Sequence, residues 1–98
     1  MASFTIDTDA VRQKANVVEN FADEYDAIRL RLLNTATSMG AAYESADNKV
    51  YVARITECCN QLQQMSEKLR NAAQILKSQS DSYDATEENN TQQASKLP

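Results

Sequence analysis

The chain has few side chains that could do chemistry, and its two cysteines are the first to consider. Cys58 and Cys59 are neighbours, and a disulfide between adjacent residues is strained and cannot join distant parts of a chain. There is no histidine among the 98 residues, so the commonest general base and metal ligand is missing. A cysteine nucleophile needs a base and an oxyanion site, and the sequence indicates neither. Both cysteines are therefore expected to be reduced, small core residues.

Other signatures of catalysis are missing as well. Gly40 is the only glycine, which excludes a glycine-rich loop for binding phosphate. The acidic residues are scattered, so no paired-carboxylate site is indicated. The net charge of -4 argues against binding to nucleic acid or to an anionic membrane surface. The sequence predicts a protein that is not an enzyme, uses no metal or cofactor, and acts by binding other proteins.

Tyr83 and Glu87 are the pair of side chains best suited to recognition by a partner. They stand four residues apart, which places them on one helix face if a helix continues that far. The simpler interpretation is that Tyr83 ends an apolar seam and that Glu87 is a solvated charge. Both interpretations are open from the residues alone.

Two long helices would have to position these residues. Apolar residues recur at seven-residue spacing in each half of the chain, which is typical of coiled-coil-like helix packing. The residues at this spacing, expected to pack against partner helices, are Val11, Val18, Tyr25, Leu32, Ile55, Leu62, Leu69 and Leu76. The complementary seam positions are expected to be Ala15, Ala22, Ile28 and Ala36 in the first half, and Tyr51, Cys58, Met65 and Ala72 in the second. Phe21 and Leu33 are expected to widen the first stripe, and Val52, Cys59 and Ala73 the second. Residues expected to fall off the seam include Arg12, Glu19, Asp26 and Arg29.

The resulting fold prediction is all-α, an antiparallel two-helix hairpin over residues 1–84. Asp7 is the expected N-cap of a first helix over about 8–42, followed by a turn at about 43–46 and a second helix over about 47–84. Whether the first helix ends at Gly40 or continues to about residue 43 is open. Residues 85–98 are polar and unpatterned and are predicted to form a flexible tail.

Size and composition bear on assembly and location. A lone two-helix hairpin of this length would be marginally stable, so a four-helix bundle with a partner or with a second copy is expected. No stretch of 18 apolar residues is present, so no membrane insertion is expected. The N-terminal segment lacks the features of a signal peptide, so export would need a different route.

Short motifs in the chain have a recognisable layout. Tyr43, Glu44 and Ser45 lie almost at mid-chain, Tyr51 follows Ser45 by six residues, and the segment 83–87 reads Tyr-Asp-Ala-Thr-Glu. Their joint placement resembles the WXG (ESAT-like) superfamily of small helical hairpins exported by type VII secretion systems. Members of that family carry Trp-x-Gly in the central turn, an aromatic residue after it, and often Tyr-x-x-x-Asp/Glu after the second helix.

The resemblance implies a turn motif at Tyr43, Glu44 and Ser45, with tyrosine in place of tryptophan and serine in place of glycine. It also implies a secretion or targeting motif at Tyr83 and Glu87. Because it lacks Trp-x-Gly, the chain also resembles the small α-helical proteins associated with LXG toxins in Firmicutes. Those proteins carry Phe-x-x-x-Asp near the C-terminus. The partners implied are the N-terminal helical domain of an LXG-type toxin, a second small helical protein or a second copy, and the secretion ATPase.

The leading hypothesis is a type VII secretion protein that binds an LXG-type toxin and targets it for export. The chain would be cytoplasmic before export and secreted by a route independent of a signal peptide. A self-paired secreted homodimer and a cytosolic coiled-coil adaptor without an export role are the alternatives. A needle-type filament subunit fits less well, because the proline-containing turn usual in such subunits is missing.

Overall fold

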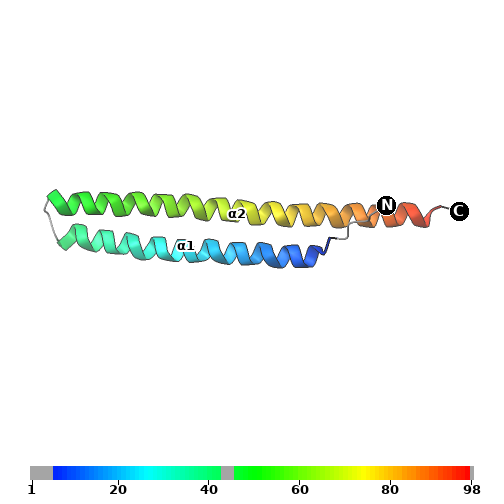
Figure 1. The fold of residues 1–98 in the computed structure, drawn as a ribbon, viewed down its shortest axis with the longest axis horizontal. Coiled ribbons are helices and arrows are strands. Elements are labelled where there is room, and N and C mark those ends of the chain that lie inside the picture. Colours follow the sequence, from blue (N-terminus) through cyan, green and yellow to red (C-terminus); the bar gives the residue numbers. More distant parts are fainter. Residues whose placement is uncertain (1–5, 43–45, 98) are drawn as a thin grey trace.

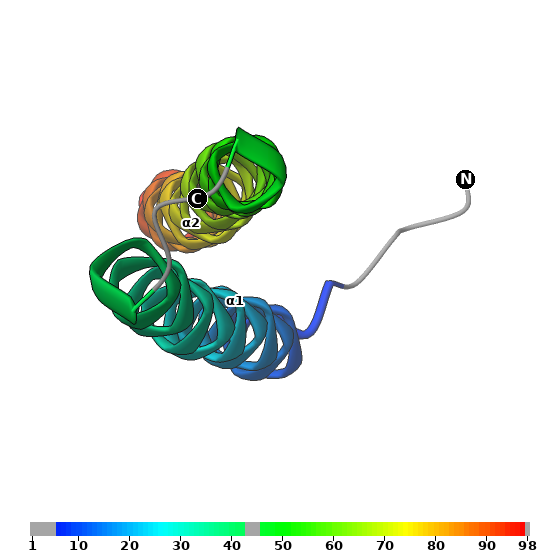
Figure 2. The ribbon, with the colours of Figure 1, turned by 90° about the vertical axis from the view of Figure 1, so that its left-hand side faces the viewer.

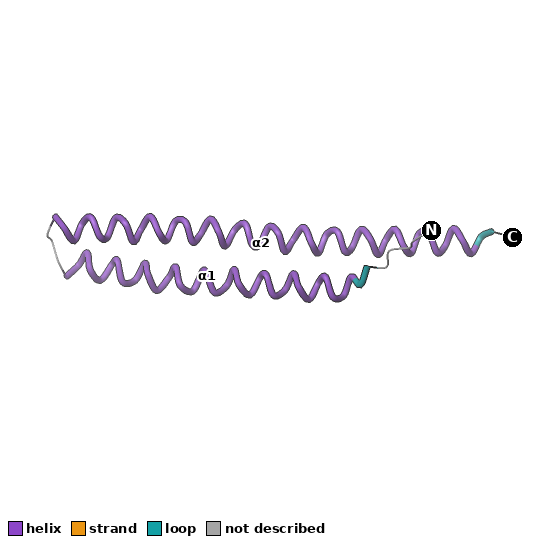
Figure 3. Tube along the Cα trace, in the orientation of Figure 1, coloured by secondary structure: helices purple, strands orange, loops and turns teal. Residues whose placement is uncertain are grey.

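The computed structural model describes residues 6–42 and 46–97, and two helices account for nearly all of them. Helix α1 spans Thr8–Ala42 and helix α2 spans Ala46–Ser95, with lengths of 35 and 50 residues. The helices lie side by side in opposite directions, as Figures 1 and 3 show. The hairpin measures 82 × 19 × 16 Å along its principal axes. The predicted all-α antiparallel hairpin is confirmed.

The start of α1 follows the local signals in the sequence. Asp7 Oδ1 accepts a hydrogen bond of 3.1 Å from the backbone N–H of Ala10, and its carbonyl accepts the first helical bond, 3.1 Å, from Val11. This geometry satisfies one of the backbone donors that a helix leaves unpaired at its N-terminus. Asp9 adds negative charge in the first turn, where the helix dipole favours it. Asp7 is the N-cap, as predicted.

Gly40 does not end the first helix. The helix passes through Gly40 and continues to Ala42, and the glycine has no positive φ and an open space where a side chain would begin. Of the two endpoints left open by the sequence, the later one fits the structure. The proposed turn motif at 43–45 lies outside the described residues.

The turn end of the hairpin is closed by a side chain from α2. Asn48 is buried, and its Nδ2 donates a hydrogen bond of 2.9 Å to the backbone carbonyl of Met39. Met39 lies in the last turn of α1, where carbonyl groups lack partners within their own helix. Asn48 therefore ties the end of α1 to the beginning of α2.

The second helix is longer than the sequence indicated. It was expected to end near residue 84, but α2 continues to Ser95, and its last residues extend past the start of α1 in Figure 1. Residues 85–95 are exposed, and the expected flexible tail is helical over this range. Once a helix is started by packed residues, each further residue adds one hydrogen bond, and no proline occurs before Pro98 to stop it.

The helices contact each other through rows of small residues. In the described residues, the buried set consists of Ala15, Ala22, Ala36, Cys59, Ala73, Asn48, Ser66 and Ser80, and no large side chain is completely buried. The eight residues predicted for partner packing, from Val11 to Leu76, are half-buried beside these rows. Small side chains permit two helix backbones to approach closely, while the larger neighbours cover the edges of the contact. Figure 2 shows the two helices packed as a single pair.

In α2, the row of Ile55, Leu62, Leu69 and Leu76 faces α1 as predicted, whereas the second predicted row is displaced by one position. Tyr51, Cys58, Met65 and Ala72 are exposed, and the buried row lies one residue later, at Cys59, Ser66, Ala73 and Ser80. Hydropathy favoured Met65 over Ser66, but a close contact between two helices requires small side chains, so Ser66 is the buried residue. The Ser66 hydroxyl is also satisfied there, because it hydrogen-bonds the carboxylate of Asp26. The two cysteines are both free, but only Cys59 is the buried core residue that was predicted.

A similar one-residue shift occurs in α1. Ile28 was expected in the seam and Arg29 outside it, whereas Ile28 is exposed and Arg29 is half-buried in the row of Ala22 and Ala36. The Arg29 Nε lies 3.9 Å from Asp26 Oδ1, and the Arg29 carbonyl accepts a long bond of 3.6 Å from the Cys59 thiol. The stem of a long arginine side chain can lie along such a seam, but the buried Arg29 Nε makes no hydrogen bond within the described residues and has only the Asp26 carboxylate at 3.9 Å nearby.

Candidate functional site

Tyr83, one half of the predicted targeting motif, lies where α2 passes the start of α1. Its side chain is half-buried, and its hydroxyl accepts a hydrogen bond of 3.3 Å from the backbone N–H of Ile6. A surface hollow at this end is lined by Tyr83 and Leu76 from α2, by Val11 from α1 and by Ile6, which precedes α1. Tyr83 therefore has a structural role in closing the open end of the hairpin.

Glu87, the other half of the motif, lies one turn further on. It is exposed, and α2 is continuous through both residues, so the spacing of four places Tyr83 and Glu87 on neighbouring turns of one face. Sequence reasoning required a helix that persists to residue 87, and the structure has it. The arrangement leaves Glu87 accessible on the projecting part of α2, while much of Tyr83 is covered by α1.

Asp84 joins the two helices at the same end. The Arg12 Nη2 donates hydrogen bonds to Asp84 Oδ2 at 2.6 Å and to Asp81 Oδ1 at 2.8 Å. The Thr8 hydroxyl donates to Asp84 Oδ1 at 2.8 Å. The bond from Arg12, followed by that from Thr8, holds the pKa of Asp84 below its ordinary value, and the two carboxylates raise the pKa of Arg12. Arg12 was predicted to lie outside the seam, and in the structure it lies beside the seam, where its ion pairs join the two helices.

Two more ion pairs continue along this edge. Lys77 Nζ lies 2.8 Å from Glu19 Oε1, and Arg70 Nη2 lies 2.8 Å from Asp23 Oδ1 and 2.6 Å from Asp26 Oδ2. We call the pairs made by Arg12, Lys77 and Arg70 the ion-pair edge. The bond from Arg70 is the main cause that lowers the pKa of Asp26. Arg12, Lys77 and Arg70 each pair with a carboxylate on the opposite helix, so the edge fixes the lengthwise register of the hairpin.

Acidification is expected to weaken the hairpin through this edge. Asp26 and Asp84 have folded-state pKa values below those of the unfolded chain, so their stabilising contribution is complete above the ordinary aspartate pKa of about 3.9. The contribution is lost as the pH falls through the lower folded-state values. The urea midpoint, followed by circular dichroism, is therefore expected to fall on acidification below about pH 4.

A variant separates this effect from general protonation. Changing both Asp26→Asn and Asp84→Asn is expected to give a lower midpoint at neutral pH and a smaller further loss on acidification. An unchanged acid dependence in that double variant would assign the effect to other carboxylates.

The opposite edge of the hairpin is apolar. Phe21 is three residues after Val18, Ile28 is three after Tyr25, and both are about half exposed, at 51% and 48%. In α2, Tyr51 precedes Ile55 by four and Met65 follows Leu62 by three, with exposed fractions of 61% and 43%. Val17 precedes Phe21 by four and is also exposed. We call these five residues, Val17, Phe21, Ile28, Tyr51 and Met65, the apolar face.

Helix geometry places the apolar face away from the ion-pair edge. Arg12 and Glu19 each stand three residues before an alanine of the buried row, whereas Phe21 and Ile28 stand beside the row of larger residues on the other flank. In α2, Arg70 and Lys77 likewise flank the small row at Ala73, and Met65 flanks the row at Leu62 and Leu69. Since the ion pairs join the two helices on one side, the five residues of the apolar face lie on the other side of the hairpin, spread along its length.

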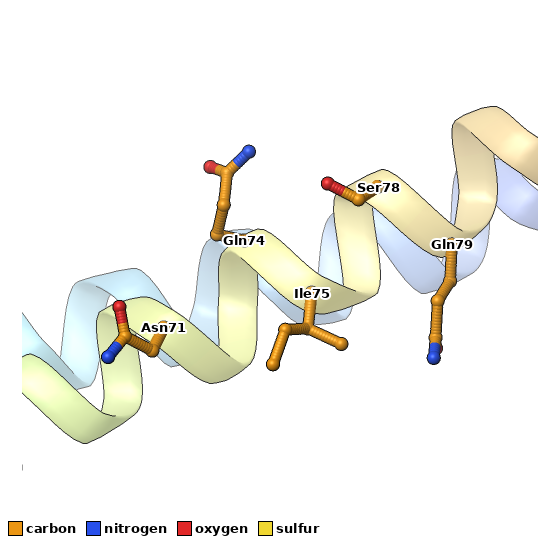
Figure 4. A pocket seen from close by; sticks show the side chains of 5 residues that line it. All are labelled: Asn71, Gln74, Ile75, Ser78 and Gln79. Atoms are coloured by element: carbon orange, nitrogen blue, oxygen red, sulfur yellow. The ribbon is translucent and has the colours of Figure 1, made fainter.

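Shallow hollows elsewhere on the helices offer little for a small ligand. One surrounds Ile75, and Figure 4 shows it lined by Asn71, Gln74, Ser78 and Gln79 as well, all from α2 with α1 behind. Its polar groups are neutral amides and a hydroxyl. No group of three or more His, Cys, Asp or Glu side chains in the described residues could hold a metal ion. Neither described helix is long and apolar enough to cross a bilayer.

The fold and its surfaces define an extended antiparallel helical hairpin with one charged edge and one apolar face. Comparison with protein families, curated proteins and solved structures found no match to this chain. The resemblance to WXG proteins thus remains a prediction from the motifs quoted above. The sequence reasoning missed the ion-pair edge, although Arg12, Arg70 and Lys77 stand at heptad-related positions that could have revealed it.

Proposed function

We propose that this protein binds helical partners and has no catalytic activity, and that it serves a type VII secretion system by targeting an LXG-type toxin for export. The observation that carries the binding role is the mismatch between core and surface. The buried core contains only small side chains, whereas large apolar residues such as Phe21, Ile28 and Met65 remain exposed. Five of the eleven exposed large apolar residues in the described chain lie on the apolar face, and an exposed apolar face is typical of a protein-binding surface.

The secretion role depends on the resemblance and on two residues. Tyr83 and Glu87 occupy neighbouring turns of a continuous helix, and Glu87 is accessible beyond the start of α1. In this proposal the toxin's N-terminal helical domain binds the hairpin, with a second small helical protein or another copy completing a four-helix bundle. The secretion ATPase binds the C-terminal end of α2, where Tyr83 and Glu87 lie. The chain is cytoplasmic until it is exported without a signal peptide.

Co-expression with a toxin encoded beside the gene tests the targeting function. The two proteins are expected to co-purify, and toxin in the culture supernatant is expected to fall at least tenfold when the gene is deleted. A toxin that is exported equally well without this protein would contradict the proposal.

Point variants then separate targeting from folding. Glu87→Ala is expected to reduce export while leaving co-purification and helix content unchanged, because Glu87 is exposed. Glu88→Ala is the matched control, since it removes a neighbouring exposed carboxylate from a different helix face. Tyr83→Ala is less informative alone, because the Tyr83 hydroxyl also binds the Ile6 backbone; Tyr83→Phe isolates that bond. Equal export by the Glu87 and Glu88 variants would remove the motif from the mechanism.

A further inference from the structure

The search for a second site leads to the charges that border the apolar face. Six charged residues stand three or four positions from one of its members, which places them on the same side of the helix: Lys14, Glu24, Arg31, Asp47, Arg54 and Lys68. Four of these six are basic, although the whole chain has 10 basic and 14 acidic residues. The border of the apolar face is thus positive in a protein whose net charge is -4.

The basic residues on the two sides of the hairpin differ in how they are neutralised. On the ion-pair edge, Arg12, Arg70 and Lys77 each contact a carboxylate at 2.8 Å or less. On the other side, Lys14, Arg31, Arg54 and Lys68 are exposed and make no ion pair within the described parts of the chain. These four cations are available to an incoming partner.

The apolar face is made of one row of side chains from each helix, and the groove that two packed helices leave between them separates the rows. The Arg70–Asp26 pair and the Cys59–Arg29 bond set an antiparallel register that brings Met65 to about the level of Ile28. Phe21 and Ile28 are seven residues apart on α1. On α2, Met65 follows Tyr51 by 14 residues, which is two heptads, so both occupy the same heptad position. Two parallel rows with this repeat present regularly spaced holes for the apolar side chains of a third helix.

We propose that the apolar face binds an amphipathic helix of another protein whose apolar stripe is bordered by glutamate or aspartate. Lys14 stands seven residues before Phe21, at the end of the α1 row, and Arg31 lies outside that row. Arg54 and Lys68 lie outside the α2 row. Acidic residues at the flanking heptad positions of the partner then meet cations on both sides. This inference rests on the proposed binding function and specifies the surface used and the chemistry of the partner.

Charge also distinguishes this partner from a second copy of the chain. Two copies joined through the same face would bring two net positive borders together, and like charges across an interface suppress association. An anionic membrane would satisfy the cations as well, but it would not require two rows of seven-residue spacing. The acidic helix accounts for both the charge and the spacing.

Two designed helical peptides provide the test. Both carry leucine at the two core heptad positions, and they differ only in having glutamate or lysine at the flanking positions. The full-length protein is expected to bind the glutamate peptide at least about tenfold more tightly at low salt, because the six charges beside the apolar face are four cations and two carboxylates, so attraction outweighs repulsion for glutamate and the reverse holds for lysine. Fluorescence anisotropy measures the affinities, and the preference is expected to diminish as salt is added.

Variants of the protein locate the surface. Phe21→Ser and Ile28→Ser are expected to reduce binding of the glutamate peptide at least about tenfold. Leu30→Ser is the matched control, because Leu30 is equally exposed, at 51%, but lies on α1 away from this groove. Changing Arg31→Glu and Lys68→Glu together is expected to invert the preference towards the lysine peptide, whereas Lys96→Glu leaves it unchanged. Circular dichroism shows whether each variant keeps its helices.

Several results would overturn the inference. Equal affinity for the two peptides, or an equal loss in the Leu30 variant, would exclude the basic-bordered groove. Self-association at the concentrations used, abolished by Phe21→Ser, would assign the face to a second copy. Binding to phosphatidylglycerol vesicles in preference to either peptide would assign it to a membrane surface. If the protein prefers the glutamate peptide but does not co-purify with the toxin, this inference stands and the secretion function is rejected. If it co-purifies with the toxin but does not prefer the glutamate peptide, the secretion function stands and this inference is rejected.

Discussion

Replacing Ala73 with leucine is expected to lower the free energy of unfolding of the hairpin by about 1–3 kcal/mol. Ala73 has no exposed surface, and it lies in the row of small α2 side chains that faces the buried alanines of α1. A leucine side chain cannot fit there unless the helix backbones move apart. Such a movement would reduce contacts along the seam and lengthen the Arg70 and Lys77 ion pairs on either side of it.

Urea denaturation followed by circular dichroism measures this loss. The matched control is Ala53→Leu, which adds the same side chain to an exposed position of α2. Alanine and leucine have similar helix propensities, so the control is expected to change stability by less than about 0.5 kcal/mol. Comparable midpoints for the two variants would mean that size is not what selects the residues of the seam.

Replacing Asn48 with alanine is expected to lower the free energy of unfolding by about 1 kcal/mol. Asn48 is 8% exposed, and its Nδ2 donates to the Met39 carbonyl at 2.9 Å. Removing the amide leaves that carbonyl without this donor in the last part of α1. The higher helix propensity of alanine offsets only part of the loss.

The control for Asn48 is Asn60→Ala on the exposed surface of the same helix. There, the substitution is expected to leave stability unchanged or to raise it by a few tenths of a kcal/mol, since only helix propensity changes. Hydrogen exchange at the end of α1 gives a second measurement, because protection of its last turns is expected to fall only in the Asn48 variant. Equal exchange in both variants would show that the Asn48 bond does not hold the turn end together.

The structure separates two kinds of apolar residue that look alike in the sequence. Leu62 and Met65 are both large, apolar and at heptad spacing, yet Leu62 is half-buried by α1 and Met65 is exposed. Periodicity identifies a broad apolar stripe, but it does not show which part of the stripe the neighbouring helix covers. The part left uncovered is the proposed binding face, which is why the binding site depended on the register between the helices.

The sequence by itself determined the two helices and the reversal between them. Unbroken seven-residue repeats on either side of a short interruption, the Asp7 cap, and the near absence of glycine and proline leave the chain little other local structure to adopt. Local signals were weaker at the C-terminal end, where composition indicated a flexible tail after residue 84 and the helix continues to Ser95. The polar composition of residues 85–95 shows that this segment buries little apolar surface. It does not show that the segment can continue a helix whose preceding residues are held by packing.

Only the tertiary structure decided which residues form the seam, which charges pair and which face stays open. The seam depends on how closely two backbones approach, and that distance favours Ser66 and Ala73 over the more apolar Met65. The pairing of Arg70 with Asp23 and Asp26 depends on the lengthwise register of residues far apart in the chain. Both are properties of the contact between the helices, so neither can be assigned from the pattern of one helix considered alone.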